Sequence, residues 1–227
     1  MTAELVRALL STERSPEIPE ASDLYGWWTT TDPQGAVSLL KQGGYVVVFR
    51  HGATDESQKD IYPFRFEDMK AQRQLNEKGR ETARTIGVSL KELGILIGEV
   101  YTSRLNRAVE TGKLIGAGDV VPKDELTDSS AGSASSMANP EGNNEKLGRS
   151  LRELGASKAT ATTNVLIVTH KTNVTDAFGK TYADIQEGEA LIFRPTTLLW
   201  KQAWVLQSIG KRISSAKKRC SNRSTRA

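Results

Sequence analysis

Hydrophobic residues along this chain follow two different spacings. Nearly continuous apolar runs at 45–49 and 165–168 are typical of strands that are buried on both faces. At 76–93 the apolar positions recur every three or four residues, which predicts a helix with one buried face. The same two patterns predict further strands at 99–102, 120–121 and 190–193 and further helices at 33–42, 105–114, 145–154 and 174–178. Strands that alternate with helices predict an α/β fold in three layers, with a mostly parallel central sheet flanked by helices.

Composition divides the chain into three parts. We expect an irregular extension at 1–30, one folded domain at 31–198 and a basic, disordered tail at 199–227. Within the domain, residues 129–144 contain almost no large apolar side chains, so they predict a loop. At the start of the tail, Trp200, Trp204 and Leu206 predict a short amphipathic helix.

The positive charge of the chain is concentrated at one end. The formal net charge is +4, but residues 201–227 hold eight of the Lys and Arg residues and no Asp or Glu. Subtracting these eight charges leaves −4 for residues 1–200. A solvated tail is therefore the favoured interpretation, and we do not expect nucleic acid or another polyanion as a partner.

No targeting or membrane segment is predicted. The amino terminus contains Glu4 and Arg7 where a secretory leader needs a basic start and an uninterrupted apolar run. No apolar run approaches the ~20 residues that span a bilayer. Cys220 is the one cysteine, so no disulfide forms within the chain, and the cysteine content does not distinguish an oxidising from a reducing compartment. We expect a cytoplasmic protein by default.

The two histidines of the chain stand at comparable places. His51 follows the apolar run at 45–49 after Arg50, and His170 follows the run at 165–168. In an open α/β sheet, the ligand crevice lies beyond the carboxyl ends of the parallel strands. We therefore expect the two imidazoles, which are far apart in the sequence, to meet over one substrate.

Side chains that suit an anion accompany both histidines. They are Arg50, Thr54, Ser103, Arg104, Arg107, Lys171 and Asn173. Arginine holds a phosphate with a planar fork of donors, and the start of a helix favours an anion. Guanidinium groups also lower the pKa of a nearby imidazole, which keeps a ring nitrogen free to attack phosphorus. Arg50 and Arg107 with the two histidines therefore predict a phosphoryl pocket, whereas Arg104 is expected to be a solvated surface charge.

Neither a metal ion nor another cofactor is expected. Two histidines without a nearby cysteine, and without a histidine pair at helical spacing, fall short of a transition-metal site. A pocket lined by arginines also repels a cation.

Four motifs occur in a characteristic order. They are Arg50-His51-Gly52, Leu75-Asn-Glu-Lys-Gly79, Ser103-Arg-Leu-Asn-Arg107-Ala-Val-Glu-Thr111 and Thr169-His170. Together they resemble the histidine phosphatase superfamily, also called phosphoglycerate-mutase-like, over about residues 36–195. The resemblance implies a phosphoglycerate-mutase-like fold and a small phosphorylated substrate. It implies that His51 takes the phosphoryl group, which Arg50, Arg107 and His170 bind and stabilise. Thr54 would add a phosphate contact.

The resemblance gives two candidates for the general acid. In the phosphoglycerate-mutase branch, a Glu two residues after a Leu protonates the leaving oxygen, and Asp128 stands at that place after Leu126. Glu125 is the substitute candidate. In the acid-phosphatase branch an Asp directly follows the second His, where this chain has Lys171.

The favoured function is hydrolysis of a phosphate monoester through a phosphohistidine on His51. The stretch between Thr111 and His170 is too short for the large insertion of true mutases, so hydrolysis is favoured over mutase-type phosphotransfer. A phosphate-binding module that has lost turnover is an alternative. A polyanion-binding protein that acts through residues 201–227 is another.

Overall fold

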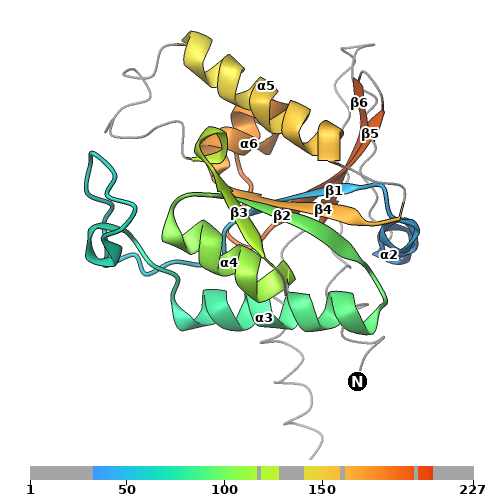
Figure 1. Cartoon of the computed structure of the whole chain (residues 1–227), viewed down its shortest axis with the longest axis horizontal. Helices are drawn as coiled ribbons and strands as arrows, with labels where there is room; N and C mark the ends of the chain where they lie inside the picture. The colour runs from blue at the N-terminus through green and yellow to red at the C-terminus, as the bar shows by residue number, and fades with distance from the viewer. Residues whose placement is uncertain (1–32, 117–118, 128–140, 159–161, 197–198, 207–227) are drawn as a thin grey trace, which may run out of the picture.

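One sheet organises the part of the chain described by the structure, a computed structural model (Figure 1). The described residues are 33–116, 119–127, 141–158, 162–196 and 199–206. In them the sheet has six strands in the order β3-β2-β4-β1-β5-β6. The strands are β1 (Val46–Arg50), β2 (Ile97–Ser103), β3 (Val120–Lys123), β4 (Asn164–Thr169), β5 (Ala190–Thr196) and β6 (Leu199–Leu206). The first four are mutually parallel, and β5 and β6 join by antiparallel pairing.

Helices cover both faces of this sheet, which makes three layers (Figure 1). The helices are α2 (Pro33–Gln42), α3 (Glu77–Glu92), α4 (Asn106–Gly116), α5 (Glu141–Lys158) and α6 (Lys171–Phe178). Short 3₁₀ turns are η1 (Met69–Ala71), η2 (Asp124–Leu126) and η4 (Lys180–Tyr182). The predicted fold class, α/β with a mostly parallel sheet flanked by helices, is confirmed.

Alternate side chains of the central strands enter two separate cores. Val47 and Phe49 of β1 pack with residues of α2, α3 and α4, whereas Val46 and Val48 pack with residues of α5 and α6. Since both faces of β1 are buried, its sequence is continuously apolar. Because β1 to β4 are parallel, their carboxyl ends lie at one common edge of the sheet, and polar side chains collect beyond it.

The start of α3 is fixed against the segment that follows β1. The Asn76 side chain caps the helix by accepting the Gly79 N–H at 2.8 Å, and its amide donates to the Thr54 carbonyl at 2.8 Å. Gly79 lies so close to the backbone of Ala53 that no Cβ fits there. The helix thus holds the segment after Arg50 in place.

The carboxyl-terminal segment departs from the expected elements. The amphipathic helix expected around Trp200, Trp204 and Leu206 is wrong, because these residues belong to β6, which pairs along β5. The disorder expected from residue 199 is likewise wrong for 199–206, which continue the sheet past the boundary expected at 198. Trp, Val and Leu also suit strands, and β5 offered an edge for pairing.

Some expectations concern parts of the chain outside the described residues. These parts are the extension at 1–30, most of the loop expected at 129–144, and the basic residues after Leu206. Within the described helices, none has the length and apolar character needed to cross a membrane.

Gly79→Ala should lower the free energy of unfolding by about 1–3 kcal/mol, because the added methyl overlaps the Ala53 backbone. Helix propensity alone would favour alanine by up to ~1 kcal/mol, so the sign of the effect is diagnostic. The control is Lys78→Ala at the exposed neighbouring position, which should change stability by less than about 0.5 kcal/mol. Urea unfolding followed by circular dichroism measures both variants. A Gly79→Ala chain as stable as the parent would contradict this tight contact.

Candidate functional site

The two histidines lie together at the carboxyl ends of β1 and β4. These strands pair with Arg50 opposite Thr169, and the His51 N–H donates to the Thr169 carbonyl at 3.1 Å. The ring centroids of His51 and His170 are 5.2 Å apart, with 58° between the ring planes. Each residue is only 2% exposed. The structure therefore brings the two imidazoles to one buried place, as their positions at strand ends suggested.

His51 is held in one tautomer. Its Nδ1 lies 2.9 Å from the Gly52 carbonyl, which can only accept, so Nδ1 carries the proton and Nε2 keeps its lone pair. The Gly52 N–H in turn donates to Thr111 Oγ1 at 3.0 Å, which fixes this turn. Burial, followed by the neighbouring His170 and Arg107, lowers the pKa of His51 well below the ordinary 6.5. A neutral ring at pH 7 follows, with Nε2 available as a nucleophile.

His170 is also neutral but has a different partner. Its Nε2 lies 2.7 Å from Ser103 Oγ, and within the described residues its buried Nδ1 has no hydrogen-bond partner. Burial, and then the charges of Arg107, Arg73 and Arg50, lower the pKa of this ring well below its ordinary value. If Ser103 donates its hydroxyl proton to Nε2, Nδ1 carries the ring proton and can donate to an added oxyanion.

Two guanidinium groups flank the rings, and each meets a carboxylate. Arg50 donates from Nη1 to the Ile185 carbonyl at 2.6 Å, and its Nη2 lies 3.6 Å from Glu187 Oε1. The Arg107 side chain is only 2% exposed, and its Nη1 lies 2.9 Å from Asp60 Oδ1. Buried guanidinium charge requires such partners. The positive charges of both guanidinium groups are thus balanced by carboxylates of the protein itself.

Glu187 is a pocket residue that the sequence analysis missed. It accepts from Thr54 Oγ1 at 2.8 Å and from the Thr54 N–H at 3.1 Å, and its Oε1 lies 3.9 Å from His51 Nδ1. The single hydroxyl proton of Thr54 is therefore used by Glu187 and not offered to a phosphate. Glu187 comes just before β5, and β5 runs antiparallel beside β1, so its start lies at the edge where β1 ends. Only the strand order could have revealed this.

Asp60 and Arg73 were missed as well. Both lie on the segment between β1 and α3, and Asp60 Oδ1 accepts the Arg73 N–H at 2.9 Å as well as Arg107 Nη1. The Gln72 side chain anchors this segment by accepting the backbone N–H of Asn106, the first residue of α4, at 2.8 Å. The segment has no helical or strand periodicity, so its sequence gave no signal of where these residues lie.

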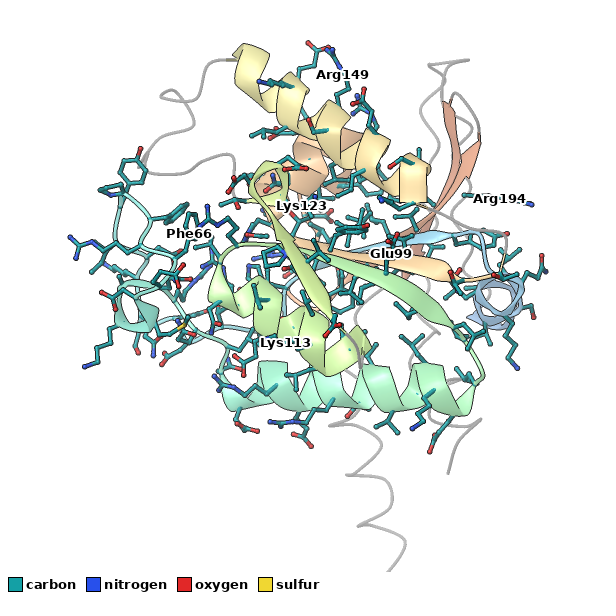
Figure 2. All side chains as sticks on the ribbon, in the orientation of Figure 1. Phe66, Glu99, Lys113, Lys123, Arg149 and Arg194 are labelled. Carbon is teal, nitrogen blue, oxygen red and sulfur yellow. The ribbon has the colours of Figure 1, made fainter. Side chains whose placement is uncertain are left out.

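The remaining predicted residues lie outside this cluster or outside the described chain. Arg104 pairs with Asp124 at 2.9 Å and lies over the ring of Phe66, 4.0 Å from its centroid. Figure 2 shows Phe66 near the start of α4. Lys171 is exposed, and Asn173 is buried with its amide on the Thr127 carbonyl. Asp128 lies outside the described residues. Glu125 is half-buried in η2, where the described structure gives it no hydrogen bond or ion pair.

The chemistry of this cluster is that of an anion site. In the described part of the chain, no group of three or more His, Cys, Asp or Glu residues is placed to hold a metal ion. What the cluster offers is one imidazole nitrogen with a free lone pair, a second neutral imidazole, and two guanidinium groups. These are the groups that bind and transfer a phosphoryl group.

Comparisons with known proteins address the same region. A family model described as "Histidine phosphatase superfamily (branch 1)" matches residues 46–157, a range that includes the first three motifs and ends before His170. A stretch of 70 residues is 39% identical to the 2,3-bisphosphoglycerate-dependent phosphoglycerate mutase of Staphylococcus haemolyticus (strain JCSC1435). That match covers 31% of this chain and only 28% of the length of the mutase.

Solved structures with a similar fold are more distant in sequence. The protein histidine phosphatase SixA complexed with tungstate is 19% identical, with a TM-score of 0.44 over 66% of this chain and 86% of that chain. A mutant phosphoserine phosphatase from Entamoeba histolytica in complex with phosphoserine is 13% identical, with a TM-score of 0.48 over 74% of this chain and 97% of that chain. The resemblance to the histidine phosphatase superfamily that the four motifs predicted is confirmed by the family match at residues 46–157.

Proposed function

We propose that this protein hydrolyses a small phosphate monoester through a covalent phosphohistidine on His51. The observation that carries the proposal is the buried His51 ring, which is neutral, donates from Nδ1 to Gly52 and keeps the lone pair on Nε2. An imidazole without a proton on the attacking nitrogen is the form needed for nucleophilic catalysis. Burial alone would also suit a structural histidine, but the second ring and the guanidinium groups around it favour phosphoryl chemistry.

In the first step, His51 Nε2 attacks phosphorus and the bond to the leaving oxygen breaks. Arg50 and Arg107 stabilise the negative charge on the other phosphoryl oxygens. His170 adds a donor from its Nδ1, which has no other partner among the described residues. In the second step, water attacks phosphorus, the P–N bond breaks, and its electrons return to His51.

The proton for the leaving oxygen must come from an acid at the pocket. The family resemblance suggests Asp128, with Glu125 as the substitute, and both roles stay predictions. Thr54 can contact the phosphoryl group only if its hydroxyl turns from Glu187, so its part in substrate binding is secondary in this proposal.

Mutase-type phosphotransfer is a second candidate. It is favoured by the 39% identity to a phosphoglycerate mutase over 70 residues. Both functions share the phosphohistidine and differ in the acceptor, which is water in one and a second substrate hydroxyl in the other. Release of inorganic phosphate from 4-nitrophenyl phosphate, compared with transfer to added glycerate phosphates, distinguishes them.

His51→Ala should lower hydrolysis of 4-nitrophenyl phosphate by at least ~10³-fold, because it removes the ring nitrogen that takes the phosphoryl group in this proposal. The parent chain, mixed with ³²P-labelled substrate and quenched in base, should retain label that acid releases. His51→Ala should retain none. Activity at the parent level in His51→Ala would contradict the proposal.

Arg107→Lys should lower kcat/KM by ~10²-fold, because it keeps the charge but loses the planar fork of donors. The control is Arg104→Lys, three residues earlier, whose side chain pairs with Asp124 at the surface. Steady-state kinetics with the same aryl phosphate should give Arg104→Lys within ~2-fold of the parent. Equal losses in both variants would argue against Arg107 as a phosphate contact.

Neither imidazole should titrate near its ordinary value in the folded protein, because burial lowers the pKa of both His51 and His170 well below 6.5. With just two histidines, ring signals in ¹H–¹³C NMR should stay those of neutral rings from pH ~8 to ~5.5. The unfolded chain takes up protons at these positions as the pH falls through ~6.5 while the folded chain does not. The free energy of unfolding should therefore decrease below that pH. A ring that titrates at 6.5 or above would contradict the neutral nucleophile.

A further inference from the structure

Asp60 is a carboxylate inside the candidate site that the reaction described so far does not use. Its Oδ1 accepts two hydrogen bonds, from Arg107 Nη1 and from the Arg73 N–H, both at 2.9 Å. No described residue donates to its Oδ2. The side chain is 23% exposed although its partner Arg107 is almost fully buried. Asp60 therefore reaches from the mouth of the site to the buried guanidinium, with one oxygen fixed and the other free.

The second pocket carboxylate has no such freedom. Glu187 uses Oε1 to accept from Thr54 Oγ1 and Oε2 to accept from the Thr54 N–H. Its Oε1 also lies 3.6 Å from Arg50 Nη2. Both oxygens are thus engaged on the side of β1, where Glu187 orients Thr54 and Arg50.

We propose that Asp60 is the proton donor to the leaving oxygen, through Oδ2. This inference rests on the phosphohistidine reaction proposed above and assigns its missing acid to the segment between β1 and α3. A phosphoryl group bound by Arg107 lies next to the carboxyl that already occupies that guanidinium. A general acid needs this proximity, within hydrogen-bond reach of the leaving oxygen.

Charge explains how Asp60 acquires its proton. When a phosphate group shares Arg107, two negative groups lie side by side, and one proton shared between them relieves the repulsion. Since Oδ1 remains fixed by Arg107 and Arg73, Oδ2 is the oxygen that carries this proton.

The bonds balance over the two steps. As His51 Nε2 bonds to phosphorus and the P–O bond to the leaving group breaks, the proton on Asp60 Oδ2 moves to the leaving oxygen, which departs as an alcohol. Asp60 is then a carboxylate. It takes a proton from the water that attacks phosphorus, the P–N bond breaks, and Asp60 is protonated again for the next turnover.

The test compares aryl and alkyl phosphates with Asp60→Asn, which keeps the shape of the side chain and removes the acid. With phenyl phosphate or an alkyl phosphate, which have poor leaving groups, phosphoenzyme formation measured by rapid quench should fall by at least ~10²-fold. With 4-nitrophenyl phosphate, whose leaving group needs little protonation, the loss should be under ~10-fold. Asp60→Ala should show the same dependence on the leaving group.

The matched control is Asp68→Asn on the same segment. The Asp68 carboxylate accepts the Lys70 N–H at 3.0 Å and pairs with no arginine side chain in the described structure, so both substrate classes should react as with the parent. Losses of equal size for good and poor leaving groups in Asp60→Asn would overturn the proposal. So would faster reaction with tighter inhibition by inorganic phosphate, since Asp60 would then only compete with substrate for Arg107.

Two further variants separate this proposal from the acids that the resemblance suggests. If Asp128→Asn or Glu125→Gln shows the dependence on the leaving group and Asp60→Asn does not, the acid is not Asp60. If the parent forms no acid-labile phosphoenzyme with 4-nitrophenyl phosphate, the phosphohistidine reaction itself fails. That result is read from the parent and is independent of any Asp60 variant.

Discussion

The parallel pairing of β1 with β4 is the constraint on which the site depends. Its register sets Arg50 opposite Thr169, and the residue that follows each strand is a histidine. A slip by one residue would turn every side chain of a strand to the other face and separate the two rings. At the opposite end of the pair, Asn164 accepts the Tyr45 N–H at 3.2 Å and donates to the Leu40 carbonyl at 2.7 Å. This buried side-chain amide joins the start of β4 to the segment that leads into β1, and it therefore holds the register at the end of the strands opposite the histidines.

Burial then determines the charge state of each group beyond these strands. The two imidazoles lose water and lie beside guanidinium charge, so they stay neutral. Arg107 stays charged and has Asp60 as its partner, and Arg50 lies near Glu187. In the proposed reaction, a bound phosphate shares the guanidinium groups with these internal carboxylates. The affinity for phosphate then depends on both sets of ion pairs.

Periodicity and placement at strand ends were enough to predict much of this arrangement. Both faces of β1 and β4 are buried, so their sequences showed continuous apolar runs, and the residues after those runs were the two histidines. The place of Arg107 could be predicted in the same way, because it lies at the start of a helix that follows a strand. Asp60, Arg73 and Glu187 come from segments without a repeating pattern, and their positions depend on contacts across the fold. The expected helix at the carboxyl terminus failed for a related reason, since only the free edge of β5 determines that residues 199–206 form a strand.

The segment between β1 and α3 has a second consequence for the chemistry, because the start of α4 holds it. The Gln72 side chain accepts the Asn106 N–H, and the Asn106 side chain donates to Gln74. Arg107, the next residue of α4, reaches Asp60 on that same segment. The helix that supplies the anion-binding guanidinium therefore also fixes the loop that supplies the carboxyl. In the proposed reaction, a displacement of the loop would alter the distance of Asp60 from a bound phosphate, so proton donation would depend on the contacts between Gln72, Gln74 and α4. Such coupling would give a loop that lies outside the sheet and its covering helices the positional precision that general acid catalysis requires.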